Sequence, residues 1–326
     1  MSIEFCAGVD VGGTKVSSAL FDADGQAFDR DKVALDRSGS SVAAAQVVRI
    51  IEGLEAAAAR RGGALRAAGV CIPGIAYHDS GLVWAPNIPG WDHFDLRAAL
   101  ERSVKLPIVI DSDRSAYVLG EQWRGVARGL KDVVFLAVGT GIGAGILTGG
   151  RLCRGSEDIA GAVGWFGLNP YFRDEYAAMG CFEAEASGNS VGRKARQAVK
   201  AGASTEIRSL AGGDPERITA ETVIAAARQR DALALQIVDE TAAYLAMGIA
   251  NIISILNPQI VVLGGGLFQA GDILVEPVRR EFKRWAQPLA ALKVRVELSS
   301  LGEDAGLVGA GRLAWESLKG EESCLR

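Results

Sequence analysis

The chain is short of the residues that most often build metal centres and disulfide frameworks. It has two histidines and five cysteines among 326 residues, and no Cys-x-x-Cys pair. With so few imidazoles, a histidine-based metal site or a Ser-His-Asp triad is disfavoured. Scattered thiols, odd in number, are typical of a reducing compartment, so we expect a cytoplasmic protein.

Excess charge of one sign is also lacking. The 35 Lys and Arg residues face 39 Asp and Glu residues, and no basic stripe is visible. We therefore expect no nucleic-acid partner and no membrane partner. A strand pattern begins almost at the first residue, so no signal peptide is expected. The longest apolar helix, expected over 233–256, contains two acidic residues and an asparagine, which indicates a buried core helix.

Glycine, by contrast, is abundant, with 41 residues against 9 prolines. The length suggests about two domains. Strand patterns at 4–10, 16–22 and 26–34 open the first half, and patterns at 132–138, 143–148 and 151–153 open the second. We expect one domain over 1–111, completed by a final helix within 304–326, and a second domain over 112–303.

The most informative glycines lie in residues 8–15, Gly-Val-Asp-Val-Gly-Gly-Thr-Lys. The segment supplies a carboxylate, two bare glycines, a hydroxyl and a cation, in the order Asp10, Gly12, Gly13, Thr14 and Lys15. Bare amides can close around phosphate oxygens, and an adjacent carboxylate can hold a magnesium ion or its water. A P-loop would have Lys before Thr and would lead into a helix. We therefore predict a phosphate cradle between two strands; the alternative is a glycine-rich hairpin without a ligand.

Two further glycine clusters follow predicted strands. The first contains Gly139, Thr140 and Gly141, and the second contains Gly264, Gly265 and Gly266. Ligands gather at the carboxyl ends of strands in open sheets, which favours one shared nucleotide site. Close packing between strands would also explain the first cluster, and glycine triplets are common in loops.

Asp113 is the acid that best fits a catalytic role. It follows a buried strand and begins a helix, where the helix dipole favours the ionised carboxylate, so we expect a low pKa. An aspartate that orients a hydroxyl and finally accepts its proton suffices for phosphoryl transfer. The alternative is a helix N-cap, which Asp111, Ser112 and Asp113 can all supply.

Taken in order, these motifs resemble the actin-like ATPase superfamily and, more narrowly, the ROK family (repressors, open reading frames and sugar kinases), over nearly the whole chain. The matching stretches are residues 10–15, 73–74, 86–91, 139–143, 180–183 and 264–266. The resemblance implies an α/β fold with two actin-like ATPase (ribonuclease H-like) domains around a central cleft, and a homodimer. It also implies ATP and Mg²⁺ as cofactors, with Asp10 holding magnesium through water and Asp113 as the catalytic base. The sugar-side residues that it implies are Pro73, Gly74, Asn87, Ser112, Trp165 and Glu183.

The chain departs from the family pattern at the sugar box. Ser112 stands where the family usually has Asn, and Ala162 and Trp165 replace the Glu and His of the Ala-Gly-Glu-x-Gly-His box. Of the family's zinc cluster, which uses that histidine and three cysteines, only Cys181 remains, so we predict no zinc site. We expect loop 166–179 to be held by aromatic packing instead. The aromatic residues available are Trp165, Phe166, Tyr171, Phe172 and Tyr176.

These features predict ATP-dependent phosphorylation of a hexose, or of a related sugar or polyol. The lost carboxylate and imidazole predict a sugar unlike glucose or the N-acetylhexosamines, or weak affinity for them. The alternative is a non-catalytic sugar- or nucleotide-binding homologue, a sensor or degenerate kinase. A repressor is disfavoured, because no helix-turn-helix segment precedes Asp10.

Overall fold

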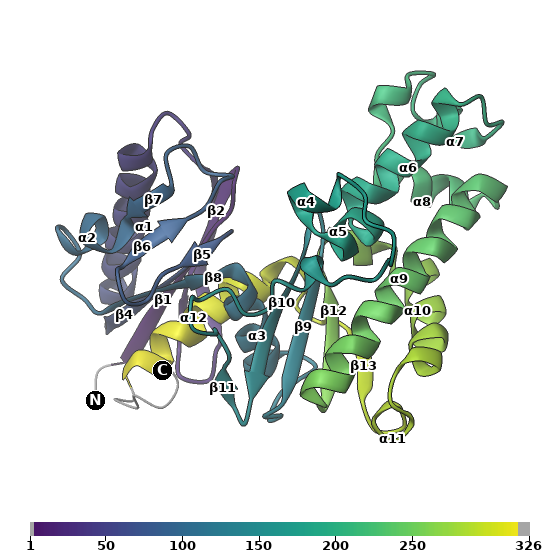
Figure 1. Ribbon diagram of the computed structural model, residues 1–326. Helices are drawn as coiled ribbons and strands as arrows, with labels where there is room; N and C mark the ends of the chain where they lie inside the picture. Colours follow the sequence, from purple (N-terminus) through teal and green to yellow (C-terminus); the bar gives the residue numbers. More distant parts are fainter. Residues whose placement is uncertain (1–2, 319–326) are drawn as a thin grey trace. The chain divides into compact units, whose positions relative to one another are not determined.

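The computed structural model describes residues 3–318 and divides the chain into two compact units (Figure 1). The first unit comprises Met1–Val133, Gly145–Ala160 and Ser299–Arg326, and the second comprises Val134–Ala144 and Gly161–Leu298. The domain division expected from the sequence stays a prediction. The helix that starts at Asp113 lies in the first compact unit, whereas the domain boundary expected from the sequence, between residues 111 and 112, would assign it to the second domain.

The first unit is built on a five-stranded sheet of order β3-β2-β1-β4-β8. Its strands are β1 (Ile3–Val11), β2 (Lys15–Phe21), β3 (Ala27–Ala34), β4 (Gly63–Ile72) and β8 (Ile108–Ser112). The first three strands, which the sequence predicts at 4–10, 16–22 and 26–34, form an antiparallel meander, and β1, β4 and β8 run parallel. Because Asp10 pairs with Cys71, and Cys71 pairs with Asp111, these three residues form one row across the carboxyl ends of the parallel strands.

Helices cover both faces of this sheet, as alternation along β1 requires. Val9 and its odd-numbered neighbours pack with α1 (Ser40–Arg60), whereas Cys6 packs with α12 (Ala305–Leu318). The other helices of this unit are α2 (Leu96–Glu101) and α3 (Asp113–Arg124), and α3 packs along α12. The contact of α12 with β4 is very close, since a Cβ on Gly69 would clash with the carbonyl of Ala310.

A small sheet in the first unit corrects one expectation. Residues 82–90 are expected to be loop because of their prolines, but β6 (Leu82–Trp84) pairs with β5 (Ile75–Ala76) and β7 (Asp92–Asp95). Both prolines, Pro86 and Pro89, lie beyond the end of β6, so they do not interrupt its hydrogen bonds.

The second five-stranded sheet has the order β11-β10-β9-β12-β13. Its strands are β9 (Val133–Val138), β10 (Ile142–Thr148), β11 (Arg151–Leu152), β12 (Ile260–Gly264) and β13 (Arg295–Leu298). The α-helices of the second unit are α4 (Tyr176–Met179), α5 (Cys181–Ala186), α6 (Gly188–Lys200), α7 (Glu206–Leu210), α8 (Ala220–Arg228), α9 (Ala232–Leu256), α10 (Gly271–Trp285) and α11 (Pro288–Ala291). The sequence predicts a single helix over 183–200, but the structure has two helices there, separated at Ser187. The hydroxyl of Ser187 caps α6 by accepting from the amide of Ser190.

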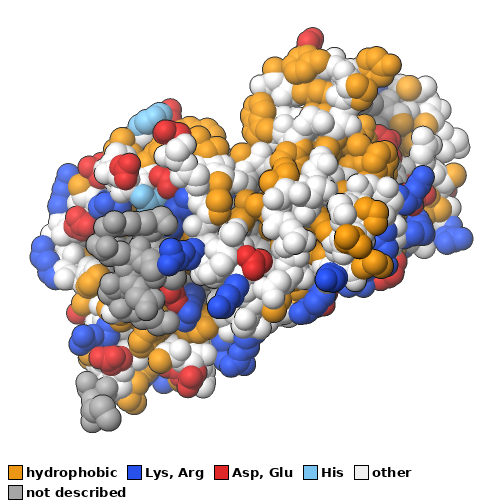
Figure 2. Space-filling model, turned by 60° about the horizontal axis from the view of Figure 1, so that its bottom comes forward, with side chains coloured by type: hydrophobic (Ala, Val, Ile, Leu, Met, Phe, Trp, Pro, Cys, Tyr) orange, Lys and Arg blue, Asp and Glu red, His pale blue; other side chains and the backbone are white. Residues whose placement is uncertain are grey.

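The long helix α9 is the centre of the helical part of the second unit. Within residues 3–318 it alone is long and apolar enough to cross a membrane by length and composition, and half of its most apolar window is buried. It packs against α10, α8, α5 and α6. Figure 2 shows hydrophobic side chains interspersed with Lys and Arg over one view of the surface. Separately, large apolar side chains are exposed near the ends of α9, α10 and α11. They are Ile255, Trp285, Leu289 and Leu292.

Candidate functional site

The first glycine turn joins β1 to β2, which confirms the predicted strand–turn–strand geometry. The amide of Gly12 donates to the carbonyl of Lys15 over 2.8 Å, and the side chains of Thr14 and Lys15 are exposed. A Cβ on Gly13 would lie 3.2 Å from the Cβ of Asn87, so the bare turn and this asparagine are direct neighbours. Phosphate binding by this turn stays a prediction.

Asp10 ends β1 beside this turn and is enclosed from two sides. The thiol of Cys71 donates to its Oδ1 over 3.3 Å, and a Cβ on Gly306 of α12 would lie 2.6 Å from its Oδ2. Burial raises its pKa, against the hydrogen bond from Cys71 and the charge of Lys32. A carboxylate next to a bare turn fits a magnesium ion held through water. Within residues 3–318, no three His, Cys, Asp or Glu side chains are grouped so as to hold a metal directly.

Asp113 is the first residue of α3, and the N-cap is Ser112. The hydroxyl of Ser112 accepts from the amide of Ser115 over 3.2 Å, so the capping role falls to the neighbour of Asp113. The Asp113 carboxylate accepts from the amide of Arg114 over 2.8 Å and from the hydroxyl of Tyr117 over 3.2 Å.

The expected low pKa of Asp113 is wrong. Burial, joined by the nearby charge of Asp10, raises the pKa of Asp113 to about 6, although Arg114 and the hydrogen bond from Tyr117 act in the opposite direction. Desolvation of a carboxylate disfavours its charged form, and here it outweighs the helix N-terminus. A pKa near 6 suits a base that works close to neutral pH.

A buried ion cluster lies next to Asp113, and sequence reasoning missed it. Asp111 is 2 % exposed, and its Oδ2 accepts from Nε and Nη2 of Arg154 over 3.0 and 2.6 Å. His78 Nε2 lies 3.6 Å from the same oxygen, and His78 Nδ1 lies 2.8 Å from Oδ1 of Asp158. Burial alone would raise the pKa of Asp111, but His78 and Arg154 lower it to about 2. These four residues are the Asp111 cluster.

The remaining sugar-side residues predicted in the first unit differ in what they can offer a ligand. Asn87 is exposed in the turn after β6, whereas Ser112 is buried and its hydroxyl is engaged at the helix cap. Gly74 follows the half-buried Pro73, and a Cβ on Gly74 would clash with the carbonyl of Trp84. This glycine is therefore required by close packing against β6.

The second glycine turn joins β9 to β10. The amide of Gly139 donates to the carbonyl of Gly141 over 2.9 Å, and the carbonyl of Gly139 accepts from the amide of Gly188 at the start of α6. Thr140 is exposed. Oε2 of Glu183 accepts from the amide of Ile142 over 2.7 Å. A Cβ on Gly141 would lie 2.6 Å from that oxygen, so the glycine is needed for Glu183 to reach the turn.

The glycine triplet follows β12 and leads into a 3₁₀ turn, η3 (Gly266–Ala270). A Cβ on Gly264 would clash with the ring of Phe135, and Gly265 has a left-handed φ of 92° beside the backbone of Val138. Of the described residues, none lies within 4 Å of a Cβ built on Gly266. The triplet thus combines tight packing at its start with an open backbone at its end.

The loop after the sugar box is not held mainly by its aromatic residues. Phe166 stacks on Phe182 at 6.4 Å, but Trp165 and Tyr171 are 58 % and 79 % exposed. Phe172 meets Tyr176 edge-on at 6.0 Å while remaining 72 % exposed. The expected aromatic packing is therefore wrong for Trp165 and Tyr171, and Tyr176 takes part chiefly in a polar cluster described below.

The candidate residues form two sets, one in each unit. The first unit carries Asp10, Gly12, Gly13, Thr14, Lys15, Pro73, Gly74, Asn87, Ser112 and Asp113, and the second carries Gly139, Thr140, Gly141, Trp165, Glu183, Gly264, Gly265 and Gly266.

Comparison with known proteins agrees with these observations. The ROK family model matches residues 6–317. A glucokinase from Thermotoga maritima is 34 % identical over 320 residues, which cover 96 % of this chain and 98 % of that protein. An N-acetylmannosamine kinase from Escherichia coli is 32 % identical over 311 residues, which cover 94 % of this chain and 97 % of that protein.

Among solved structures, a ROK family glucokinase from Streptomyces griseus in complex with glucose and AMPPNP is similar. It matches with a TM-score of 0.76 and 29 % identity, covering 96 % of this chain and 99 % of that one. The fold is that of the ROK kinases, the actin-like ATPase fold that the motifs predict. Because the family model spans nearly the whole sequence, the chain belongs to the ROK family.

Proposed function

We propose that this protein is an ATP-dependent sugar kinase that phosphorylates a hydroxyl of a hexose, or of a related sugar or polyol, with Asp113 as the base. Membership of the ROK family and the kinases among its relatives support the reaction class. The observation that carries the assignment of the base is the Asp113 carboxylate, whose pKa burial raises to about 6. It follows the end of β8, which β4 separates from β1, the strand that bears Asp10.

Asp113 acts by orienting the acceptor hydroxyl and taking its proton as the phosphoryl group is transferred. Phosphoryl transfer has a loose transition state, so the hydroxyl needs little early deprotonation and an aspartate is basic enough. The amide of Arg114 and the hydroxyl of Tyr117 fix the carboxylate in place. Near pH 7 the group is mostly ionised, because its pKa is about 6.

ATP supplies the phosphoryl group when bound, and magnesium neutralises charge on its phosphates. The amides of Gly12 and Gly13 and the side chains of Thr14 and Lys15 would bind phosphate oxygens, as would the turn from Gly139 to Gly141. The open backbone at Gly266 would lie against the adenosine, and Asp10 would hold the magnesium ion through water. The exposed side chains of Thr14, Lys15 and Thr140 and the open backbone at Gly266 support this.

The side chains proposed to contact the sugar are Asn87 in the first unit, and Glu183 and the exposed indole of Trp165 in the second. Ala162 and Trp165 supply neither the carboxylate nor the imidazole of the family box, each worth about 1.5–3 kcal/mol as a charged hydrogen bond. An indole instead stacks on an apolar face of a sugar ring. We therefore propose a sugar or polyol substrate unlike glucose or the N-acetylhexosamines, or weak affinity for those sugars.

Turnover of ATP across a panel of hexoses, N-acetylhexosamines and polyols tests the proposal. We expect saturable turnover with at least one member, and a loss of about 10²–10⁴ in kcat for Asp113→Asn. Saturable sugar binding without phosphoryl transfer in the unmutated chain would instead establish the alternative, a sensor or degenerate kinase. A cytoplasmic location and a homodimer stay predictions, from cysteine usage and from the family resemblance respectively.

A further inference from the structure

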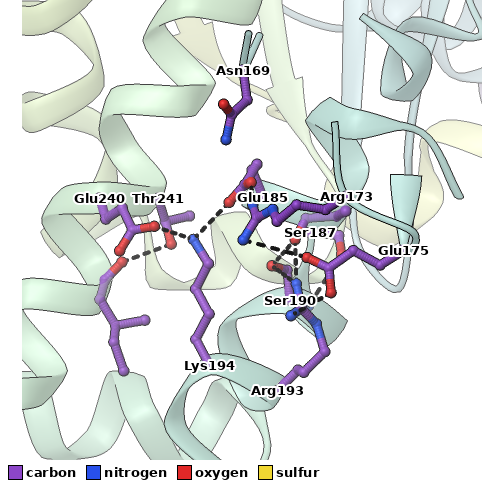
Figure 3. A network of polar contacts seen from close by, with 12 residues as sticks. Asn169, Arg173, Glu175, Glu185, Ser187, Ser190, Arg193, Lys194, Glu240 and Thr241 are labelled. Carbon is purple, nitrogen blue, oxygen red and sulfur yellow. Dashed lines mark hydrogen bonds and ion pairs between the residues drawn. The ribbon is translucent and has the colours of Figure 1, made fainter. Parts of the chain in front are cut away.

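In the second unit, outside the residues proposed for the active site, Glu185 on α5 is the most deeply buried charged side chain that the structure describes. It is 1 % exposed, and Figure 3 shows charged groups gathered around it from several elements. A carboxylate removed from water is costly unless cations and hydrogen-bond donors surround it. Its partners therefore identify which segments must stay together for the charge to be tolerated.

Three side chains reach the Glu185 carboxylate directly. The hydroxyl of Tyr176 donates to it, Arg173 forms an ion pair with it, and Nζ of Lys194 lies 3.2 Å away. The Arg173 guanidinium also lies over the Tyr176 ring, 4.8 Å from its centroid. Asn169 completes the contacts by donating to the Tyr176 hydroxyl over 3.1 Å.

A second layer balances the charge. Arg193 pairs with Glu175 at 3.0 Å, and Lys194 also pairs with Glu240 of α9. Three carboxylate side chains thus face three Arg or Lys side chains. We call this group the Glu185 cluster; its members are Asn169, Arg173, Glu175, Tyr176, Glu185, Arg193, Lys194 and Glu240. It joins loop 166–179 to α5, α6 and α9.

The same short helix carries Glu183. Two residues along an α-helix turn by about 200°, so Glu183 and Glu185 point to nearly opposite sides of α5. A helix of 6 residues has little stability of its own, so its orientation must come from its contacts. Glu185 anchors one side of α5, and on the other side Glu183 accepts from the amide of Ile142 over 2.7 Å.

The start of α5 is also tied to the segment that bears Trp165. The amide of Phe182 donates to the carbonyl of Phe166 over 3.2 Å. A Cβ on Gly180 would lie 2.8 Å from the Cα of Trp165, so the two backbones are in close contact. A displacement of α5 would therefore move both the Glu183 carboxylate and the indole.

We propose that the Glu185 cluster is a positioning device for the sugar pocket: Arg173, Tyr176 and Lys194 clamp Glu185 and so fix α5, which sets Glu183 and Trp165 for the substrate. The cluster residues are positioning residues, since they act through α5. This inference rests on the proposed function, because Glu183 and Trp165 are taken as the sugar-binding side chains.

The test compares Glu185→Gln and Tyr176→Phe with Arg228→Gln, which breaks an exposed ion pair with Asp272 in the same unit. A merely structural role would lower the fraction of folded enzyme and so reduce apparent kcat without changing KM. We expect the KM for the sugar to rise roughly tenfold in Glu185→Gln and less in Tyr176→Phe, with a smaller change in kcat. Arg228→Gln should leave KM within about twofold.

Hydrogen exchange of the Ile142 amide gives a readout that needs no turnover. This amide donates to Glu183, so displacement of α5 should speed its exchange in both cluster variants and not in Arg228→Gln. Faster exchange confined to loop 166–179, with Ile142 exchange and sugar KM unchanged, would overturn the proposal. If the unmutated chain phosphorylates no sugar, the proposed function fails, but Ile142 exchange still decides whether the cluster fixes α5.

Glu185→Gln leaves Arg173 and Lys194 facing a neutral group, so it is the variant more prone to misfolding. Tyr176→Phe removes one hydroxyl and keeps the charge balance of the cluster. An unchanged Ile142 amide and unchanged sugar KM in a folded Tyr176→Phe protein would overturn the part assigned to Tyr176, and the same result in Arg173→Met would overturn the clamp as a whole.

Discussion

Each unit places a buried, paired carboxylate two residues from a carboxylate of the candidate site. In the first unit Asp111 precedes Asp113, and in the second Glu185 follows Glu183. Cations surround both buried groups, whereas burial raises the pKa of both site carboxylates. The charged neighbour anchors the backbone, and the site carboxylate is left with few partners of its own.

The two anchors differ in the chemistry of their partners. Asp111 is held by Arg154, and His78 Nε2 lies 3.6 Å from its carboxylate. Burial lowers the pKa of His78, but the nearby Asp111 outweighs burial and raises it. Glu185 is held by Arg173, Lys194 and the hydroxyl of Tyr176, so its partners include no histidine. The two anchors thus differ in that a histidine lies beside the buried carboxylate in the first unit and not in the second.

The largest expected effect comes from breaking the first anchor. Arg154→Met should lower the free energy of unfolding by about 3–5 kcal/mol, because it leaves Asp111 charged, buried and poorly paired. Urea unfolding measures this loss, and Arg151→Met at a nearby exposed position is the control. Equal losses in the two variants would show that the pair with Asp111 is unimportant for stability.

The next effect concerns the site carboxylate itself. Its pKa rises from 3.8 to about 6 on folding, so the folded protein binds the proton more tightly than the unfolded chain. The free energy of unfolding therefore falls as pH rises from 3.8 to about 6. Above pH 6 the full cost of burying the charged carboxylate is present. Asp113→Asn should stabilise the fold by about 1–3 kcal/mol at pH 8 while removing activity. The gain should shrink as pH falls to 4; a loss of stability at pH 8 would contradict it.

The pH dependence of kcat/KM should follow the ionisation of the Asp113 carboxyl group. If Asp113 must be ionised to accept the proton, kcat/KM should be flat above about pH 6.5 and fall about tenfold per pH unit below 6. Initial rates with saturating ATP and limiting sugar give the profile. A profile that stays flat down to pH 4.5 would mean that the carboxylate of Asp113 is not the titrating group in the reaction.

The smallest effect sharpens the contrast between the two anchors. The pKa of His78 is raised, so its pairing stabilises the fold below its unfolded value of 6.5 and is lost as pH rises through the folded pKa. His78→Gln should cost about 1 kcal/mol at pH 5.5 and much less at pH 9. Tyr176→Phe in the Glu185 cluster should cost the same at both values. Urea unfolding at the two pH values measures both, and equal costs for His78→Gln would refute the pH-sensitive anchor.

The parts of the fold that are determined by residues close together in the sequence were predictable. The turn at Gly12 and Gly13 lies between two strands as its pattern indicates, and Asp113 lies at the predicted junction of strand and helix. Its raised pKa was not predictable, because the charge of Asp10 comes from another strand and the burial from tertiary packing.

Both ion clusters escaped sequence reasoning for a related reason. Arg154 reaches Asp111 from 43 residues away in the chain, and Lys194 and Glu240 meet through α6 and α9. No local period or motif marks such pairs. The helix break at Ser187 was missed, although residues 187–190 are Ser-Gly-Asn-Ser and a serine is a common N-cap, which was the available signal.

The contact of Gly306 with Asp10 has a consequence for biosynthesis. Segment 299–318 completes the first unit, yet it leaves the ribosome only after the whole second unit has been made. Until then Asp10 lacks the helix that encloses it, and β1 and β4 lack the cover of α12 on one face. The enclosure of Asp10, the carboxylate proposed to hold magnesium, therefore has to wait until residues 299–318 have been made, after the second unit.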